Sequence, residues 1–254
     1  MIDQRIVRAA VAPLAAEPRA AAEQVSQTLA GHRVSVLAYR DPWLRVRTRD
    51  GYEGWVHRGY LYDADAAALA PRFAAGRVSL GCVVREGGGA RRALPPLAVL
   101  ADDAVVEQGE ALHPAALPAR FPREAGAVPG TAQRLFAGTP YQWGGITPWG
   151  ADCSGLVQTC FALHGFALPR DARDQAELGT PVDGGFDALR AGDLLFFSDR
   201  DDGRITHVAI ALAPRRLVHL ALGRGGWAEE TLDDSADEYG RGLMGRWRES
   251  RRQG

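Results

Sequence analysis

A cysteine followed by two histidines is the combination of side chains in this sequence that suits covalent chemistry. Cys153 follows a segment rich in glycine and proline and stands at the predicted start of a helix. The free amides and the positive end of a helix favour a thiolate at such a position. His207 and His219 follow on two predicted strands. A cysteine becomes a nucleophile when a histidine base takes its proton and a polar residue orients that base. The sequence therefore predicts covalent catalysis at Cys153.

A packing role is the alternative for Cys153, because an isolated cysteine usually behaves as a small buried hydrophobe. The reactive role is favoured by the polar neighbours Asp152 and Ser154. Four nearby glycines also leave room for a substrate: Gly144, Gly145, Gly150 and Gly155. Cys160 lies about 10.5 Å further along the same helix face, which exceeds the disulfide reach of about 7 Å. Cys160 and Cys82 are therefore predicted to pack in the core.

The two histidines face each other in only one kind of hairpin. Alternation along residues 205–212 places His207 on one strand face with Ala209 and Ala211, whose small side chains leave the space that a cleft requires. With an odd loop such as residues 213–215, His207 and His219 become diagonal neighbours about 7 to 8 Å apart, whereas an even loop separates them. In the odd register, His219 can hydrogen-bond one ring nitrogen of His207 and leave the other for the thiol.

The segments around these residues divide the chain into β-rich and mixed parts. Five short strand patterns between residues 5 and 62 predict a small barrel, with a hairpin turn at residues 49–51. Further short strand patterns between residues 71 and 122 predict a second, more degenerate barrel. Prolines at 118, 122 and 129 mark a boundary near residue 123. Beyond it, helices from residue 129 and over 153–164 precede strands at 193–199, 205–212 and 216–222, an α+β pattern.

Composition and charge exclude several classes of protein. The 254 residues are 46% hydrophobic and 24% charged, which is typical of a folded globular protein. The net charge is −1, and such a near-neutral chain is not expected to have nucleic acid as its main partner. Three cysteines without metal-ligand spacing predict neither a disulfide framework nor a metal site. The N-terminal apolar run is interrupted and no run of about 18 apolar residues occurs, so we expect a soluble, cytoplasmic protein without a membrane partner.

Six sequence blocks occur in order between residues 140 and 222: PYQWGG, DCSGLV, PRDARDQ, AGDLLFF, ITHVAI and LVHLAL. In order and spacing they resemble the NlpC-type cell-wall peptidases, a branch of the papain-like fold. The run WLRVRTRDGYEGWVHRGYL resembles a bacterial SH3-like domain. The resemblance implies an α+β, papain-like catalytic domain at residues 123–254, an SH3-like β-barrel at 1–66 and a second, degenerate SH3-like barrel at 67–122. The sequence does not indicate an oligomeric state.

The resemblance also implies a role for each reactive residue. Cys153 would be the nucleophile, His207 the base and then the acid, and His219 the residue that orients His207. Tyr141 would donate its hydroxyl to the oxyanion together with the backbone amide of Cys153. The alternative for Tyr141 is an aromatic core position beside Trp143. This chemistry requires no metal and no organic cofactor.

The closest resemblance is to the γ-D-glutamyl-L-diamino acid endopeptidases, which cleave murein peptides with a free N-terminal L-Ala. Such a substrate requires acidic groups around its ammonium, because an unpaired buried ammonium is costly. The resemblance places five residues at that end of the site: Asp171, Asp152, Ser154 and, from the first barrel, Glu23 and Tyr52. The alternatives are a helix cap for Asp171, a surface role for Glu23 and Tyr52, and Glu53 as the acid from the barrel.

These inferences predict a cytoplasmic cysteine endopeptidase of cell-wall peptide recycling. Its substrates would be murein tripeptide and tetrapeptide fragments, cut between γ-D-Glu and diaminopimelate or L-Lys to release L-Ala-D-Glu. Two alternatives stay open. A murein amidase or an acyltransferase on the same fold would keep Cys153, His207 and His219 without the amine-binding acids. A non-catalytic protein that binds wall fragments would bind the peptide without turnover.

Overall fold

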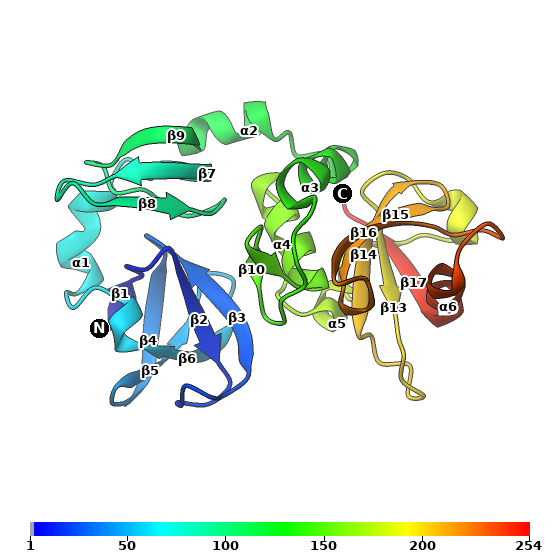
Figure 1. Ribbon diagram of the computed structural model, residues 1–254, viewed down its shortest axis with the longest axis horizontal. Helices are drawn as coiled ribbons and strands as arrows, with labels where there is room; N and C mark the ends of the chain where they lie inside the picture. The colour runs from blue at the N-terminus through cyan, green and yellow to red at the C-terminus, as the bar shows by residue number, and fades with distance from the viewer. Residues whose placement is uncertain (1–2) are drawn as a thin grey trace. The chain divides into compact units, whose positions relative to one another are not determined.

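The chain forms two compact units, and each has its own sheet and its own apolar core (Figure 1). The computed structural model describes residues 3–254. Contacts group Met1–Leu117 into the first unit and Pro118–Gly254 into the second. The domain limits at residues 66 and 122 stay a prediction. No helix in the described part of the chain is long and apolar enough to cross a membrane.

A six-stranded antiparallel sheet forms most of the first unit, in the order β1-β4-β5-β6-β2-β3. Its strands are β1 (Gln4–Ile6), β2 (Val11–Ala15), β3 (Gln24–Leu29), β4 (Arg33–Arg40), β5 (Trp43–Arg47) and β6 (Glu53–His57). Alternation buries one side of these strands around Leu14 and Val46. The first of the five predicted strand patterns, RIVRAAV at residues 5–11, is divided in the structure, where β1 ends at Ile6 and β2 begins at Val11. The chain leaves the ladder between them because the amide of Arg8 donates to the carbonyl of Tyr60.

The predicted hairpin joins β5 to β6. Gly51 lies in its turn with a φ of +86°, a left-handed conformation that glycine adopts without strain. Gly54 allows β6 to approach β2, because an added Cβ would lie 2.9 Å from the Cβ of Leu14. The glycine of the Gly-Trp pair in this motif is therefore explained by close packing of two strands.

A three-stranded antiparallel sheet follows in the order β8-β7-β9. Its strands are β7 (Val78–Arg85), β8 (Arg91–Leu94) and β9 (Val105–Leu112), with the short helices α1 (Ala66–Leu69) before it and α2 (Leu117–Arg120) after it. One of the strand patterns predicted between residues 71 and 122, LAVLAD at residues 97–102, does not form a strand, because Pro95 and Pro96 lack amide donors and Leu97 adopts a φ of +70°. That this sheet is a second SH3-like barrel stays a prediction.

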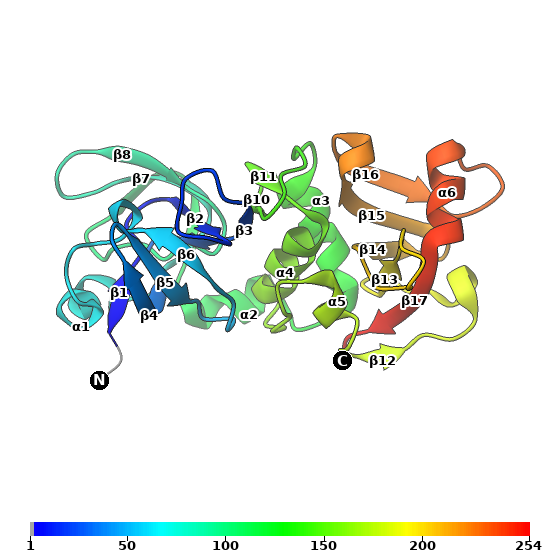
Figure 2. The same cartoon turned by 90° about the horizontal axis from the view of Figure 1, so that it is seen from below.

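The second unit is a six-stranded antiparallel sheet with helices on both faces (Figures 1 and 2). The strand order is β12 (Thr180–Pro181), β17 (Trp247–Arg252), β13 (Leu194–Phe197), β14 (His207–Ala213), β15 (Arg216–Ala221) and β16 (Gly226–Thr231). The first helices are α3 (Val128–Phe136), α4 (Cys153–Leu163) and α5 (Ala172–Gln175). A small hairpin, β10 (Ile146–Thr147) and β11 (Gly150–Ala151), lies between α3 and α4 in the chain. The predicted helices and the three predicted strands are present.

Helix α4 packs its apolar side against one face of this sheet. Leu156, Val157 and Phe161 of the helix join one buried cluster with Val208 and Ile210 of β14. All five side chains are fully buried, so burial stabilises this contact by about 1.5 to 3 kcal/mol for each side chain. The packing holds the start of α4 against the start of β14.

Helix α6 (Glu238–Arg246) covers the opposite face of the sheet. Leu243 packs there against Phe197, Ala209 and Ala211. The prediction that these alanines line a cleft is wrong, because their small side chains make room for α6. Three glycines in the nine-residue helix lower its helix propensity, which is why the sequence did not reveal it.

Candidate active site

Cys153 is the first residue of α4, and only 6% of its surface is exposed. The backbone amides of Val208 and Ser154 donate to its sulfur. Val208 directly follows His207, so the thiol lies beside the start of β14. Gly155 is required next to the thiol, because an added Cβ would overlap the carbonyl oxygen of Gly145. The loop before the cysteine therefore passes close over the first turn of the helix.

A buried ion pair holds this end of α4. Asp152 caps the helix by accepting a hydrogen bond of 2.8 Å from the amide of Gly155. Arg170, whose side chain is only 2% exposed, donates to the same carboxylate at 2.6 and 3.0 Å. Arg170 also donates to the hydroxyl of Ser154 at 2.8 Å. The two residues that flank Cys153 are thus fixed by one guanidinium group.

His207 and His219 make the predicted hydrogen bond. Nε2 of His207 lies 2.8 Å from Nδ1 of His219. Because Nε2 is used in this bond, Nδ1 is the His207 nitrogen left for the thiol. His219 is fully buried, whereas His207 is partly exposed. The pair therefore has the connectivity of a base and the residue that orients it.

A bulge in the hairpin between β14 and β15 sets this register. Ile210 pairs with Val218, which places the two histidines diagonally on one face as predicted. Ala213 pairs with Arg216, however, so the loop itself has two residues, and the bulge between Ala211 and Ala213 shifts the ladder by one. Arg215 has a φ of +57°, as expected where a turn ends in a bulge.

The electrostatics favour a neutral thiol beside a neutral imidazole. Burial and the nearby charge of Asp152 raise the pKa of Cys153 to about 12. Burial, followed by the charges of His219 and Arg246, lowers the pKa of His207 to about 3. The prediction of a resting thiolate is therefore wrong, because desolvation outweighs the effect of the helix end. The thiol must lose its proton as it attacks.

The lowered pKa of His207 predicts acid sensitivity of the fold. Between pH 6.5, the ordinary value, and about 3, the unfolded chain binds a proton at His207 that the folded chain does not. The free energy of unfolding should thus fall as the pH drops through this interval, by up to about 2 kcal/mol at pH 5. Urea titrations at pH 7 and pH 5 measure this loss. His207→Asn should lose less stability than wild type on acidification, while exposed His113→Asn should match it; equal losses in all three would contradict the assignment.

Tyr141 lies in the electrostatic neighbourhood of the thiol. Its amide donates to the carbonyl of Gly225 at 3.0 Å, and its side chain packs against the core under α4. Burial, with the nearby Cys153 and Asp152, raises the pKa of its hydroxyl above the ordinary value. The hydroxyl therefore stays a hydrogen-bond donor at neutral pH. Its oxyanion role stays a prediction.

Two of the residues predicted to bind the substrate amine contact Arg170, and a third is next to it in the chain. Asp152 and Ser154 contact its guanidinium group, and Asp171 is its neighbour in the chain. Asp171 precedes α5, but its side chain does not cap that helix. Arg170 opposes the charge of Asp152. Contact of these residues with a substrate amine stays a prediction.

Glu23 and Tyr52 lie at one end of the first sheet. Glu23 precedes β3 and Tyr52 precedes β6, the two strands that flank β2. Ala15 of β2 pairs with residues of both strands, which places the starts of β3 and β6 at the same end. Glu53, the alternative acid, pairs with two arginines, at 2.9 Å from Arg45 and 2.6 Å from Arg47. Their contact with substrate stays a prediction.

Comparison with known proteins decides the family. The model of the NlpC/P60 family matches residues 138–236, and that of the bacterial SH3 domain matches residues 11–62. Dipeptidyl-peptidase 6 of Lysinibacillus sphaericus is 30% identical over 263 residues, which cover 92% of this chain and 93% of that protein. The chain belongs to the NlpC/P60 family. The predicted fold class is thereby confirmed: an α+β, papain-like NlpC/P60 domain with an SH3-like N-terminal sheet.

Two further proteins match this chain over different lengths. The γ-D-glutamyl-L-lysine dipeptidyl-peptidase of Bacillus subtilis is 41% identical over 112 residues, which cover 39% of this chain and 37% of that protein. The chain thus spans little more than a third of that relative's length. The crystal structure of an NlpC/P60 family protein from Bacillus cereus covers 98% of this chain and 99% of its own, with a TM-score of 0.79 and 18% identity. It shows the same fold.

Two residues on the far side of the histidine pair, Glu230 and Tyr239, were not predicted from the sequence. Glu230 of β16 lies 3.6 Å from Nε2 of His219 and is paired with Arg224. Tyr239 of α6 lies edge-on to His219, with 6.1 Å between the ring centres. A strand pattern in GWAEET was the available signal for β16, but its pairing with β15 is set by the tertiary fold.

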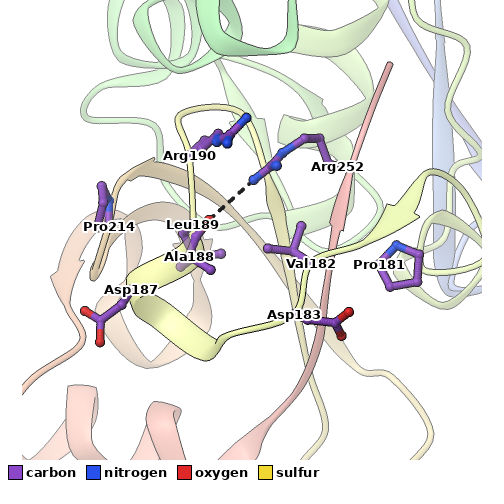
Figure 3. A pocket seen from close by; sticks show the side chains of 9 residues that line it. All are labelled: Pro181, Val182, Asp183, Asp187, Ala188, Leu189, Arg190, Pro214 and Arg252. Carbon is purple, nitrogen blue, oxygen red and sulfur yellow. Dashed lines mark hydrogen bonds between the residues drawn. The ribbon is translucent and has the colours of Figure 1, made fainter.

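No group of three or more potential metal ligands occurs among the described residues, and the three cysteines are free. Figure 3 shows a surface pocket lined by residues 181–183 and 187–190 with Pro214 and Arg252. None of the predicted site residues lines it. Of the two arginines in its lining, Arg252 is paired with Asp193 at 2.7 Å and therefore already has a structural partner.

Proposed function

We propose that this NlpC/P60 protein is a cysteine endopeptidase that hydrolyses the bond between γ-D-Glu and a diamino acid in murein peptides. Family membership supports the broader class, a cell-wall peptidase. The observation that carries the proposal is the hydrogen-bonded pair His207–His219 beside the buried thiol of Cys153. The name of the Bacillus subtilis relative, a γ-D-glutamyl-L-lysine dipeptidyl-peptidase, supports the choice of bond. Diaminopimelate and L-Lys are both proposed at the third position.

The chemistry begins with proton transfer from a neutral thiol. Nδ1 of His207 takes the proton of Cys153 as the sulfur attacks the γ-carbonyl carbon of D-Glu. The tetrahedral intermediate collapses when the carbon–nitrogen bond breaks and His207 returns the proton to the leaving amine. Water then attacks the thioester with His207 again as base. The products are L-Ala-D-Glu and a peptide with a free amine, and the thiol is restored.

Tyr141 is proposed to donate a hydrogen bond to the oxyanion. Tyr141→Phe keeps the ring and removes only the hydroxyl, so kcat/KM should fall by about 100- to 1000-fold, as on loss of one oxyanion donor. The free energy of unfolding should change little, because the ring still packs against the core. Steady-state kinetics with the tripeptide measure the effect. A kcat/KM within threefold of wild type would assign Tyr141 to packing alone.

The amine end of the substrate is proposed to meet Asp171, Asp152, Ser154, Glu23 and Tyr52. Arg170 opposes the charge of Asp152, which weakens the attraction of that carboxylate for an ammonium group. Acidic groups at this end of the substrate would favour stems with a free N-terminal L-Ala, whose ammonium they can pair with. Such short peptides occur as wall fragments, so we propose a role in their recycling within the cytoplasm.

Mass spectrometry of L-Ala-γ-D-Glu-diaminopimelate after incubation with enzyme tests the reaction. Wild type should release L-Ala-D-Glu, Cys153→Ala should release none, and the same peptide acetylated at its N-terminus should stay intact. Equal cleavage of the acetylated peptide would remove the amine-binding acids and indicate a murein amidase or another hydrolase of this fold. Binding of the peptide without turnover by wild type would indicate a non-catalytic binding protein.

A further inference from the structure

A third polar side chain, Glu230, lies beyond His219 on the side away from His207. Nδ1 of His219 faces His207, and Nε2 points to the other side, where it is fully buried. No described polar atom makes a hydrogen bond to Nε2. A carboxylate oxygen of Glu230 lies 3.6 Å away, just beyond hydrogen-bond length. An orphaned ring nitrogen in a buried site requires a partner, and Glu230 is the one in place.

Sheet register brings the three side chains together. His219 pairs with Ala228 across β15 and β16, so Glu230 lies two residues along on the same face. His207 stands in the same diagonal relation to His219 across β14 and β15. His207, His219 and Glu230 therefore form one line over three neighbouring strands.

Arg224 holds the Glu230 carboxylate in this position. Its guanidinium group donates to both oxygens, at 2.7 and 2.9 Å, and only 7% of the glutamate side chain is exposed. The same group donates to Asp237 and lies 4.4 Å from the centre of the Tyr239 ring. Burial alone would raise the pKa of Glu230, but the contacts with His219 and Arg224 outweigh it and keep the pKa below the ordinary value. The carboxylate is therefore ionised.

An ionised Glu230 carboxylate determines which ring nitrogens of His219 and His207 carry hydrogen if His207 is to act as a base. It can accept a hydrogen bond but not donate one, so the His219 nitrogen that faces it must be the one that carries hydrogen. A neutral imidazole has a single N–H, so Nδ1 of His219 is then bare and accepts from Nε2–H of His207. Nδ1 of His207 is left with a lone pair, which is the form that a base for the thiol requires.

We propose that Glu230 is a positioning residue that sets the tautomer of His219 and, through it, that of His207. The proposal rests on the proposed peptidase function, but Glu230 touches no reacting atom. Arg224 fixes the direction of the carboxylate and offsets part of its charge, so that Glu230 is held in place to orient His219. When His207 becomes an imidazolium during turnover, the aligned His219 lone pair stabilises it.

Glu230→Gln with Glu229→Gln as its control tests the proposal. Glutamine has nearly the same shape, but its amide can donate to Nε2 and so permits the reversed tautomer. Its kcat should fall by about 100-fold, the contribution of a misoriented general base, with KM within twofold of wild type. Glu229 is exposed, pairs with Arg216 at 3.0 Å and leaves His219 untouched. Glu229→Gln should keep the wild-type kcat.

Nitrogen-15 NMR of histidine-labelled protein provides the readout that a merely structural role would not move. In wild type, His219 should be protonated at Nε2 and bare at Nδ1, and Glu230→Gln should shift the proton toward Nδ1. A wild-type His219 protonated at Nδ1, or a Glu230→Gln protein with unchanged spectrum and kcat, would overturn the proposal. The wild-type spectrum decides even where the variant does not fold. Absence of peptide cleavage by wild type would refute the peptidase function separately, since the tautomer is read without substrate.

Discussion

Replacement of Cys153 by alanine should reduce kcat by at least about 10⁴-fold and leave peptide binding in place. A fall in kcat of this size is expected because the variant lacks the nucleophile, and the catalytic residues of a covalent mechanism act together as a unit. The sulfur is small and its site is lined by backbone amides of Val208 and Ser154, so the fold should tolerate its removal. Turnover is followed by mass spectrometry of the dipeptide product, and the Kd of the uncut tripeptide by calorimetry.

Cys160→Ala is the matched control for this prediction. Cys160 lies in the same helix, is fully buried, and has a pKa raised above the ordinary value, mainly by burial. Its loss should cost some stability by leaving a small cavity, but kcat should stay within about threefold of wild type. Turnover by Cys153→Ala within a hundredfold of wild type would exclude the thiol as nucleophile and, with it, the thioester intermediate.

Local patterns were sufficient to find the thiol and the histidine pair. The glycine-rich segment before a predicted helix indicates Cys153. Alternation of side chains along a predicted strand gives the face on which His207 lies. An odd or even number of residues in the hairpin loop decides whether His219 lies on the same face as His207. These are properties of residues near one another in the chain, or of two consecutive strands. The register that places His207 and His219 on one face was predicted correctly. The structure has a two-residue loop and a bulge in place of the predicted three-residue loop. The register is the same because a bulge and a longer loop each add one residue to one strand of the hairpin.

Properties that depend on the packed fold were not predictable in this way. The expected thiolate at Cys153 failed because burial of the helix start depends on the sheet beneath it. Ala209 and Ala211 were assigned to a cleft because α6, which covers them, carries too many glycines to show as a helix. Glu230 was missed for a related reason. Its relation to His219 exists only once β16 pairs with β15.

Arg170 illustrates how a residue inside a recognised block can have an unrecognised role. The block PRDARDQ drew attention to Asp171, whose carboxylate suits an amine. The neighbouring Arg170 was given no role from the sequence, yet it is buried and reaches back 18 residues to Asp152. It neutralises the one carboxylate that adjoins the nucleophile. Without it, Asp152 would be a buried charge next to a thiol that must become negative during attack.

Arg170→Met should therefore lower the free energy of unfolding by about 3 to 5 kcal/mol, because it leaves the Asp152 carboxylate buried without its partner. Urea unfolding at pH 7 measures the change. Arg173→Met, three residues on, removes an exposed arginine paired with exposed Asp174 and should cost less than about 1 kcal/mol. Adding Asp152→Asn to Arg170→Met should restore part of the loss, since the uncompensated charge is gone. Equal losses for the two arginine variants would show that the ion pair does not hold the start of α4.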